Sequence, residues 1–319
     1  MLRELYFGGW VAHNIYFLGF GGVVWYKGLR IAGLSGIFNE KHYRCGHYES
    51  PPFSDDSMRS IYHLREIEVF RAVQMSSRNS RVFKPIDIFL SHDWPNNIWN
   101  YGDCDRLLRA KPFLAEDMRC HKLGSPPLMQ LLMELKPSYW FSAHLHVKFA
   151  AIVPHSEESG KNPSVFRPPL PPGPRPSITA MDEGGRPEIV LCKAANLFTK
   201  FLALDKVLPG RYSCLFCVDF FNFIFSILVL YKYILMIVCC INRDFLQIVT
   251  IEPSLDASDV QINAQEVLCY DLEWLSIIRK THELMSTSQR HSSLPTAFDL
   301  TTSEVWLKLF VLFSSRDIK

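Results

Sequence analysis

The sequence lacks an excess of charge of either sign. Its 319 residues include 34 lysines and arginines against 32 aspartates and glutamates, which leaves a formal net charge of +2. This balance excludes a uniformly basic or acidic surface, so any contact with nucleic acid must be local. Because 48% of the residues are apolar and 21% are charged, the chain can bury a sizeable core and is not intrinsically disordered.

A regular cysteine framework is also missing. The nine cysteines are odd in number and lack the spacing of a disulfide scaffold. Near the start, Arg3 and Glu4 precede a glycine-broken aromatic stretch instead of the apolar run of a secretory signal. Cys214 and Cys217 have no second pair at zinc-finger spacing and are interpreted as packing residues. We therefore expect an intracellular, reduced protein.

Apolar segments of two kinds alternate along the first half of the chain. Residues 29–36, 86–94 and 138–147 are typical of buried strands that run into polar residues or glycine. Residues 61–73 and 125–137 have apolar side chains at helical spacing, and the second segment places Ser125 as N-cap before Pro126. This alternation predicts a layered α/β fold, with ligand sites beyond the carboxyl ends of the strands.

Three histidines follow two of the predicted strands. His92 ends the second strand, and His144 and His146 end the third, in FSAHLHVKFAA. If this stretch is extended, residues i and i+2 share one face about 6 to 7 Å apart while Leu145 faces the core. Such imidazoles suit metal ions, although isolated histidines at a strand end can simply be polar residues that reach solvent.

Two later segments differ from the rest in composition. The proline-rich stretch within residues 163–177 predicts a polyproline-like surface loop, because a core segment would not tolerate so many missing amide donors. Residues 214–241 form an apolar run interrupted by Asp219 and Lys232. Since a helix of about 20 apolar residues crosses a bilayer, hydropathy alone favours a transmembrane helix here.

Several stretches resemble a known family. IFLSHDWP and YWFSAHLHVKFAA are similar to the RNA lariat debranching enzymes, which are metallophosphoesterases. Further similar stretches, among them GGWVAHNIYFLGFGGVV, RSIYHLREIEVF and KFLALDKVLP, extend the resemblance over most of residues 8–246, and YDLEWLSIIR resembles the start of that family's C-terminal region. The resemblance implies an αββα sandwich and metal-dependent hydrolysis of the 2′–5′ phosphodiester at intron branch points, in the nucleus.

The resemblance also implies roles for particular residues. His92, His144 and His146 would be ligands of a centre of two divalent ions of Fe, Zn or Mn. Residues 38–65 resemble the family's recognition loop for branched lariat RNA, the expected partner, with no role for DNA. Aromatic and basic side chains there would stack on bases and pair with phosphates; without the resemblance, the stretch would pass for an ordinary solvated loop. The implied substrate-binding residues are Tyr43, Arg44, His47, Tyr62, His63 and Arg65.

The sequence departs from the family pattern in three places. It lacks the D/C-x-H, G-D and G-N-H-E motifs, so no catalytic histidine is assigned and the chain is expected to be incomplete at its N-terminus and inactive alone. We expect a partial core over residues 1–211, an apolar insertion over 212–242, and the last core strand with a shortened C-terminal region over 243–319. The insertion would be translated intron or a membrane helix. A non-catalytic remnant that binds branched RNA and a membrane-anchored protein remain the alternatives.

Overall fold

The computed structural model describes most of the chain in separate ranges. These are residues 4–13, 15–76, 85–155, 196–205, 251 and 268–295, together with the backbone course of 213–217, 227–231, 234–238 and 246–250. The strands are β1 (Gly9–Ala12), β2 (Ile15–Phe17), β3 (Gly21–Tyr26), β4 (Leu29–Leu34), β5 (Ile88–Ser91), β6 (Tyr139–Ser142), β7 (Phe149–Pro154), β8 (Phe198–Ala203), β9 (Ser213–Cys217), β10 (Ile227–Tyr231), β11 (Ile234–Val238), β12 (Leu246–Thr250) and β13 (Cys269–Tyr270). The α-helices are α1 (Glu40–Tyr43), α2 (Asp55–Ser60), α3 (Glu66–Val73), α4 (Cys104–Ala110), α5 (Ala115–Arg119), α6 (Pro126–Leu135) and α8 (Leu272–Lys280), with 3-10 turns at Ile98–Tyr101, Pro112–Leu114 and His282–Leu284.

A seven-stranded mixed sheet forms the centre of the fold. Its strand order is β13-β3-β4-β5-β6-β8-β7. Strands β4, β5, β6 and β8 pair in parallel, whereas the strands at both edges pair antiparallel. The carboxyl ends of the parallel strands therefore lie at one edge of the sheet, where ligand sites are expected in α/β folds.

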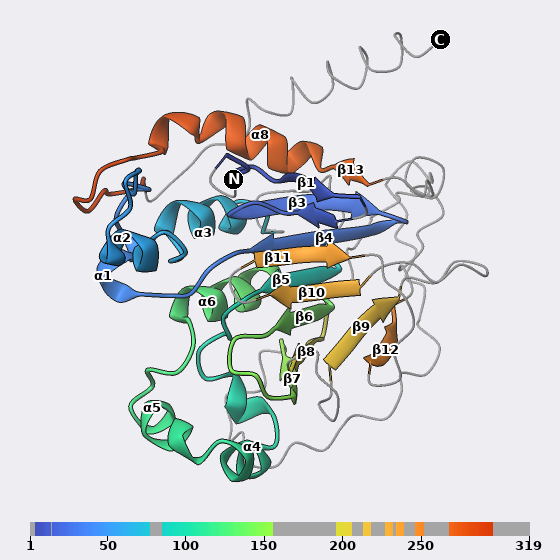
Figure 1. The fold of residues 1–319 in the computed structure, drawn as a ribbon. Coiled ribbons are helices and arrows are strands. Elements are labelled where there is room, and N and C mark those ends of the chain that lie inside the picture. The colour runs from blue at the N-terminus through green and yellow to red at the C-terminus, as the bar shows by residue number, and fades with distance from the viewer. Residues whose placement is uncertain are drawn as a thin grey trace, which may run out of the picture.

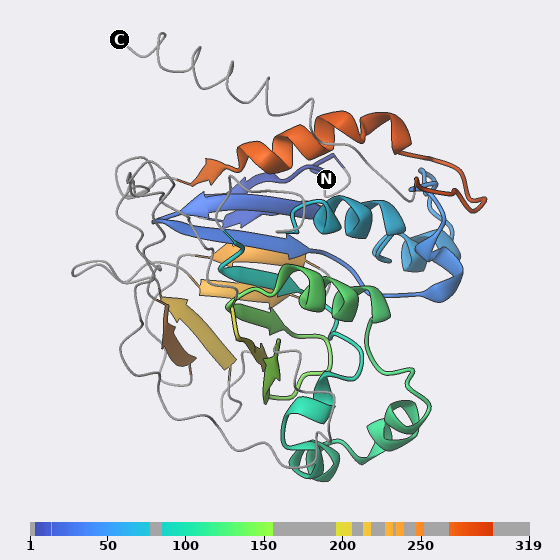
Figure 2. The same ribbon diagram turned by 180° about the vertical axis from the view of Figure 1, so that it is seen from behind.

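The fold is layered, with helices on one side of the seven-stranded sheet and a second sheet on the other. Helices α3 and α6 cover one face of the seven-stranded sheet, and the strands of a four-stranded sheet, β1-β2-β11-β10, lie on the opposite face (Figures 1 and 2). A parallel pair of strands, β9 and β12, forms a third, smaller sheet. The predicted layered α/β architecture, with two sheets and flanking helices, is confirmed.

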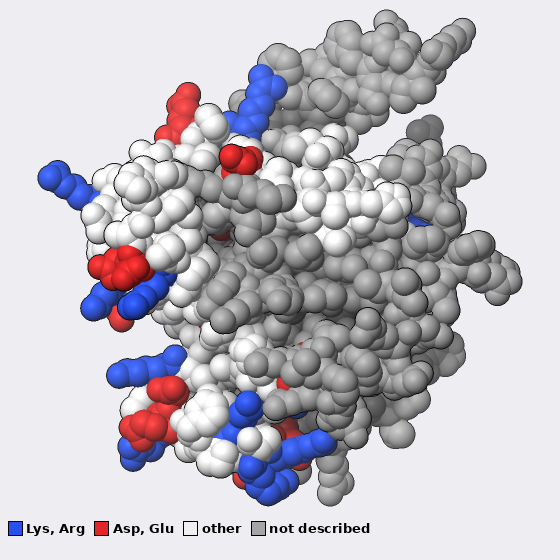
Figure 3. Space-filling view, in the orientation of Figure 1, with Lys and Arg blue, Asp and Glu red and all other residues white. Residues whose placement is uncertain are grey.

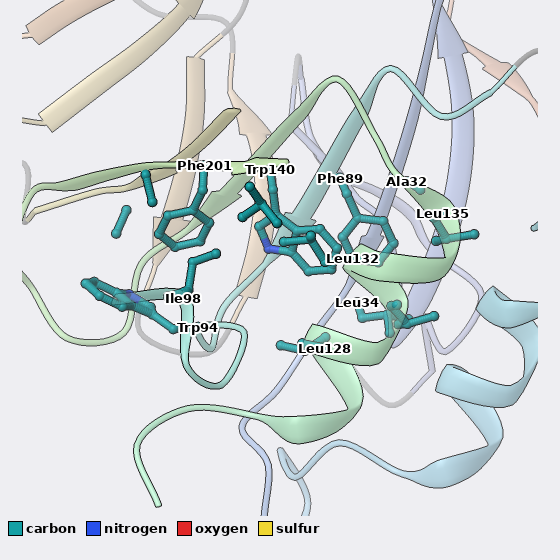
Figure 4. Close-up of a cluster of buried hydrophobic side chains, with 14 of the residues drawn as sticks. Ala32, Leu34, Phe89, Trp94, Ile98, Leu128, Leu132, Leu135, Trp140 and Phe201 are labelled. Atoms are coloured by element: carbon teal, nitrogen blue, oxygen red, sulfur yellow. The ribbon is translucent and has the colours of Figure 1, made fainter. Parts of the chain in front are cut away.

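Alternation along the central strands separates two hydrophobic clusters. Ile88 and Leu90 of β5 face the cluster on the side of the four-stranded sheet, while Phe89 between them faces the helices. On the helical side, Leu128, Leu132 and Leu135 of α6 pack toward Phe89 and Trp140, as Figure 4 shows. The rings of Phe89 and Trp140 are stacked with their centroids 4.1 Å apart. A period of two in the strands and a period of 3.6 in the helix produce this interlayer packing.

The predicted elements are largely confirmed. Strands β4, β5 and β6 lie inside the three ranges expected from the sequence, and Ser125 caps α6, its hydroxyl accepting from the Leu128 amide. The helix predicted over 61–73 is wrong in its first turn, because α3 begins only at Glu66. Residues before it leave the helical path to pair with the chain beyond β4, where the Leu64 amide donates to the Ile37 carbonyl.

The apolar segment 212–242, for which hydropathy favours a transmembrane helix, has extended backbone where the structure describes it. Strands β9, β10 and β11 fall within it, and β11 pairs antiparallel with β2. Over the ranges that the structure describes, no helix combines the length and apolar character needed to cross a bilayer. The division into an insertion and flanking parts stays a prediction, while the proline-rich loop and residues 296–319 lie outside the described residues.

Candidate metal centre and recognition loop

Two of the predicted metal ligands meet at the ends of neighbouring strands. Strands β5 and β6 run in parallel, and the Ala143 amide donates to the His92 carbonyl at 3.1 Å just beyond them. This link places His144 Nδ1 at 3.3 Å from His92 Nε2, with ring centroids 5.1 Å apart. These two histidines therefore lie together just beyond the carboxyl ends of the strands.

The backbone that carries the histidine pair differs from the prediction. An extended strand was expected through His146, but β6 ends at Ser142, and both His144 and His146 have left-handed backbone, with φ of 54° and 51°. The Leu145 amide turns back to the Ala143 carbonyl at 2.6 Å, which closes a tight turn around His144. The turn, not a shared strand face, therefore orients these imidazoles, while Leu145 packs against the core as expected. Strained backbone of this kind concentrates at functional sites.

Burial controls the protonation of His92. The side chain is buried, and loss of solvation, reinforced by the nearby charges of His144 and His146, lowers the pKa of His92 to about 3. The imidazole is therefore neutral near pH 7, which is the form that can bind a metal ion. His146 thus lies near enough to act on His92 electrostatically.

Asp93, the next residue, is committed to backbone contacts. One carboxylate oxygen accepts from the Trp94 amide at 2.8 Å and the other from the Phe38 amide at 3.1 Å. Burial raises the pKa of Asp93, an effect opposed by His144 and by these two amides. Its oxygens therefore tie the residues after β5 to the chain beyond β4, which makes Asp93 a poor substitute for a missing carboxylate ligand.

The donors that the structure brings together do not fit a two-ion centre by themselves. Within the described ranges, no group of three or more histidine, cysteine, aspartate or glutamate side chains is placed to hold a metal ion. A pair of divalent ions requires several donors each, including oxygen donors that balance charge. The histidine pair supplies imidazoles alone, so the assignment of His92, His144 and His146 as metal ligands stays a prediction.

The predicted substrate-binding residues fall into exposed and internal positions. Arg44 is exposed at the end of α1, and Tyr62 is half-buried with its ring edge-on to His63, 5.1 Å between centroids. Tyr43 is also half-buried; its ring lies 5.5 Å from that of Phe38, and burial raises the pKa of its hydroxyl. Arg44 is thus the exposed member of the set.

Arg65 and His47 are held by internal carboxylates. Arg65 is fully buried, its Nη2 donating to Glu49 at 2.5 Å and its Nη1 to the His42 carbonyl at 3.2 Å. His47 Nε2 lies 2.7 Å from Glu68 Oε1. The predicted direct contact of Arg65 with RNA does not agree with this geometry, because its guanidinium is inside the protein. Arg65 instead holds the loop through its hydrogen bonds to Glu49 and to the His42 carbonyl.

Sequence reasoning missed the partner of His63. The Nδ1 atoms of His42 and His63 lie 2.7 Å apart, and the two rings stack with centroids separated by 5.0 Å. Burial, together with His42 and Arg65, lowers the pKa of His63 to about 4, so this pair is neutral near pH 7. Glu49 and Glu68 were missed as well, since nothing in the sequence distinguishes a glutamate that folds inward from one at the surface.

Comparisons with known proteins show which family the sequence resembles. A family model described as the lariat debranching enzyme, C-terminal domain, matches residues 238–306. Lariat debranching enzymes of Arabidopsis thaliana, Homo sapiens and Drosophila melanogaster are 38%, 40% and 42% identical to this chain, over 96%, 92% and 92% of it. The chain spans 53%, 40% and 47% of the length of these relatives, about half or less.

The two packed sheets, the flanking helices and the histidines at the strand ends define a mixed α/β protein of the metallophosphoesterase-like class. Within that class the chain is similar to lariat debranching enzymes over nearly all of its own length, and its residues 238–306 match the model of that family's C-terminal domain.

Proposed function

We propose that the protein acts in the metal-dependent hydrolysis of the 2′–5′ phosphodiester of branched intron RNA, in the nucleus. The observation that carries the proposal is the pair His92 and His144, juxtaposed 3.3 Å apart beyond β5 and β6 in a chain related to lariat debranching enzymes. Imidazoles fixed at strand ends are rigid donors, which suits a site that must keep its geometry while substrate binds.

Of the donors that a metal site needs, the described residues would supply only the imidazoles. His92, His144 and His146 would hold divalent Fe, Zn or Mn, with the remaining donors coming from elsewhere in the complete site. Because the oxygen donors of such a centre are not gathered by the described residues, no reaction step is assigned to these histidines.

Recognition of RNA is proposed for residues 38–65. Arg44 is exposed and can pair with phosphate, and Tyr62 offers a ring on which an unstacked base can pack. Figure 3 shows Lys and Arg side chains interspersed with Asp and Glu along the side that carries α1 and α2, without a field of a single sign. Contact with RNA is therefore local, as the balanced composition predicts.

Binding of a branched RNA tests the proposal directly. Fluorescence anisotropy would compare a short RNA containing one 2′–5′ linkage with a linear RNA of the same sequence, in EDTA so that nothing is cleaved. We expect tighter binding of the branched RNA and a weaker complex for Arg44→Ala. Arg109→Ala, which removes an exposed arginine from α4, is the matched control. Equal affinity for branched and linear RNA would refute the proposal.

A second candidate function is binding of branched RNA without cleavage. The donor set favours it, because among the described residues no group of three or more histidine, cysteine, aspartate or glutamate side chains is placed to hold a metal ion. The two candidates differ in one measurement: addition of Mn²⁺ to the bound complex produces a linear RNA product only if the chain is catalytic.

A further inference from the structure

The chain after α8 pairs with the middle of the 38–65 loop. Residues 285–292, here called the C-terminal segment, follow α8 and the short turn at His282–Leu284 and run beside α1 and α2 in both ribbon views (Figures 1 and 2). Cys45 and His291 form an antiparallel bridge. Three backbone hydrogen bonds join the two stretches: Gly46 N to Ser288 O (2.8 Å), His47 N to Ser286 O (2.9 Å) and Ser292 N to Arg44 O (2.9 Å).

Gly46 lets the two backbones approach this closely. A Cβ atom at this position would lie 2.1 Å from the Ser286 carbonyl oxygen, a separation that real side chains do not adopt. The glycine is buried under the C-terminal segment. Any larger residue must therefore push the segment away from the loop.

A network of buried polar side chains lies beneath the same contact. The Glu68 carboxylate of α3 is buried, with His47 Nε2 at 2.7 Å, and it accepts from the Tyr6 hydroxyl at 2.7 Å. The other Glu68 oxygen accepts from the Arg65 amide at 3.2 Å. One carboxylate thus joins the loop at His47 and Arg65 to helix α3.

Arg71, one turn further along α3, extends the network to the end of α8. Its Nη1 donates to the Tyr6 hydroxyl at 2.9 Å, and its Nε donates to Thr281 Oγ1 at 2.7 Å. Arg71 and Thr281 are both buried. Burial disfavours the charged carboxylate of Glu68, but His47, Tyr6 and Arg71 outweigh this and hold its pKa below the usual value. The charges of the network are therefore paired.

We propose that Glu68 and the C-terminal segment jointly position the 38–65 loop for branched RNA, so that recognition by the loop depends on docking of the chain beyond α8. Glu68 acts as a positioning residue through His47 and the Arg65 amide, and it does not touch RNA. This inference rests on the proposed function of the loop. It extends that function by making the C-terminal segment part of the binding site, although the two stretches are about 240 residues apart in sequence.

The test measures the loop with and without RNA. Hydrogen exchange of the peptides covering residues 42–48 would be followed in the full chain, in Gly46→Ala and in Glu68→Gln. We expect faster exchange at these amides in both variants. Gly46→Ala displaces the C-terminal segment from the loop, and Glu68→Gln weakens the contacts of this side chain with His47 and the Arg65 amide. Anisotropy with the branched RNA in EDTA should show about tenfold weaker binding, the scale of losing one charge-assisted hydrogen bond.

Two control variants distinguish a loss of positioning of the 38–65 loop from a general destabilisation of the fold. Gly102→Ala introduces an equally severe clash, with a Cβ 2.3 Å from the Ala150 carbonyl oxygen, far along the chain from the loop. Glu116→Gln neutralises an exposed carboxylate. Neither should change exchange at residues 42–48. If Glu68→Gln fails to fold, Thr281→Val replaces it, since this nearly isosteric change removes the hydroxyl that accepts from Arg71 Nε.

The outcomes distinguish the two proposals. Unchanged exchange at residues 42–48 in Gly46→Ala and Glu68→Gln, or unchanged affinity for branched RNA despite faster exchange, would overturn the positioning role. Lack of preference of the wild-type chain for branched over linear RNA would instead remove the proposed function of the loop.

Discussion

Replacement of Asp271 by alanine is expected to destabilise the protein strongly, because this residue serves two purposes at once. Its carboxylate caps α8, accepting from the Trp274 amide at 2.8 Å. It also pairs with Arg30 of β4 through two hydrogen bonds of 2.8 and 3.0 Å, and accepts from Trp25 Nε1 at 2.7 Å. Asp271 is 1% exposed and so is Arg30. The change therefore removes a helix cap and half of a buried ion pair.

The magnitude follows from these contacts. Loss of an N-cap costs about 1 kcal/mol, and removal of one partner from a buried ion pair costs about 3 to 5 kcal/mol. Glu273 stays 2.7 Å from Arg30 Nη2 and offsets part of this loss. We expect Asp271→Ala to lower the free energy of unfolding by about 3 to 4 kcal/mol in total, a large share of the ordinary stability of a domain. Asp271→Asn keeps a capping oxygen and should fall between the two proteins.

Urea unfolding followed by tryptophan fluorescence measures the difference. The control is Glu116→Ala, which breaks an ion pair with Arg119 whose partners are 65% and 76% exposed, and which should cost less than about 1 kcal/mol. The reasoning is refuted if Asp271→Ala destabilises the protein no more than this surface change does.

Three other changes test the core, the loop and the site. Leu132→Ala empties a fully buried position on α6 and should cost about 2 to 5 kcal/mol in urea unfolding, whereas the neighbouring Met133→Ala, 42% exposed, should cost about 0.5 kcal/mol or less. The pKa of His63 is about 4 in the folded protein, below its unfolded value, so its contribution to stability is complete above about pH 6.5 and is lost as the pH falls toward 4; His63→Gln should flatten this loss of stability, unlike His121→Gln at an exposed site. The purified chain with Mn²⁺ should leave branched RNA uncut, while fusion to a segment carrying D-x-H and G-N-H-E should restore cleavage that His146→Ala abolishes; debranching by the chain as given would contradict the donor count.

The sequence by itself determined the layered architecture and the meeting of His92 with His144. The short apolar run of β5 predicts a strand buried on both faces, and the leucine stripe of α6 predicts which face of that helix is buried. Histidines that follow shortly after two parallel strands predict where the imidazoles meet, since carboxyl ends of parallel strands share an edge of the sheet.

The tertiary structure alone decided the details that depend on distant partners. The position of the left-handed turn at His144 depends on the hydrogen bond from the Ala143 amide to the His92 carbonyl, about 50 residues away in sequence. The extended backbone in the apolar segment depends on pairing of β11 with β2, more than 200 residues away in sequence. Whether Arg65 and Glu68 face solvent or the interior likewise depends on carboxylates, hydroxyls and amides contributed by other elements. A charged side chain enters a protein only where the fold supplies its partner, and that partner is invisible in the local sequence.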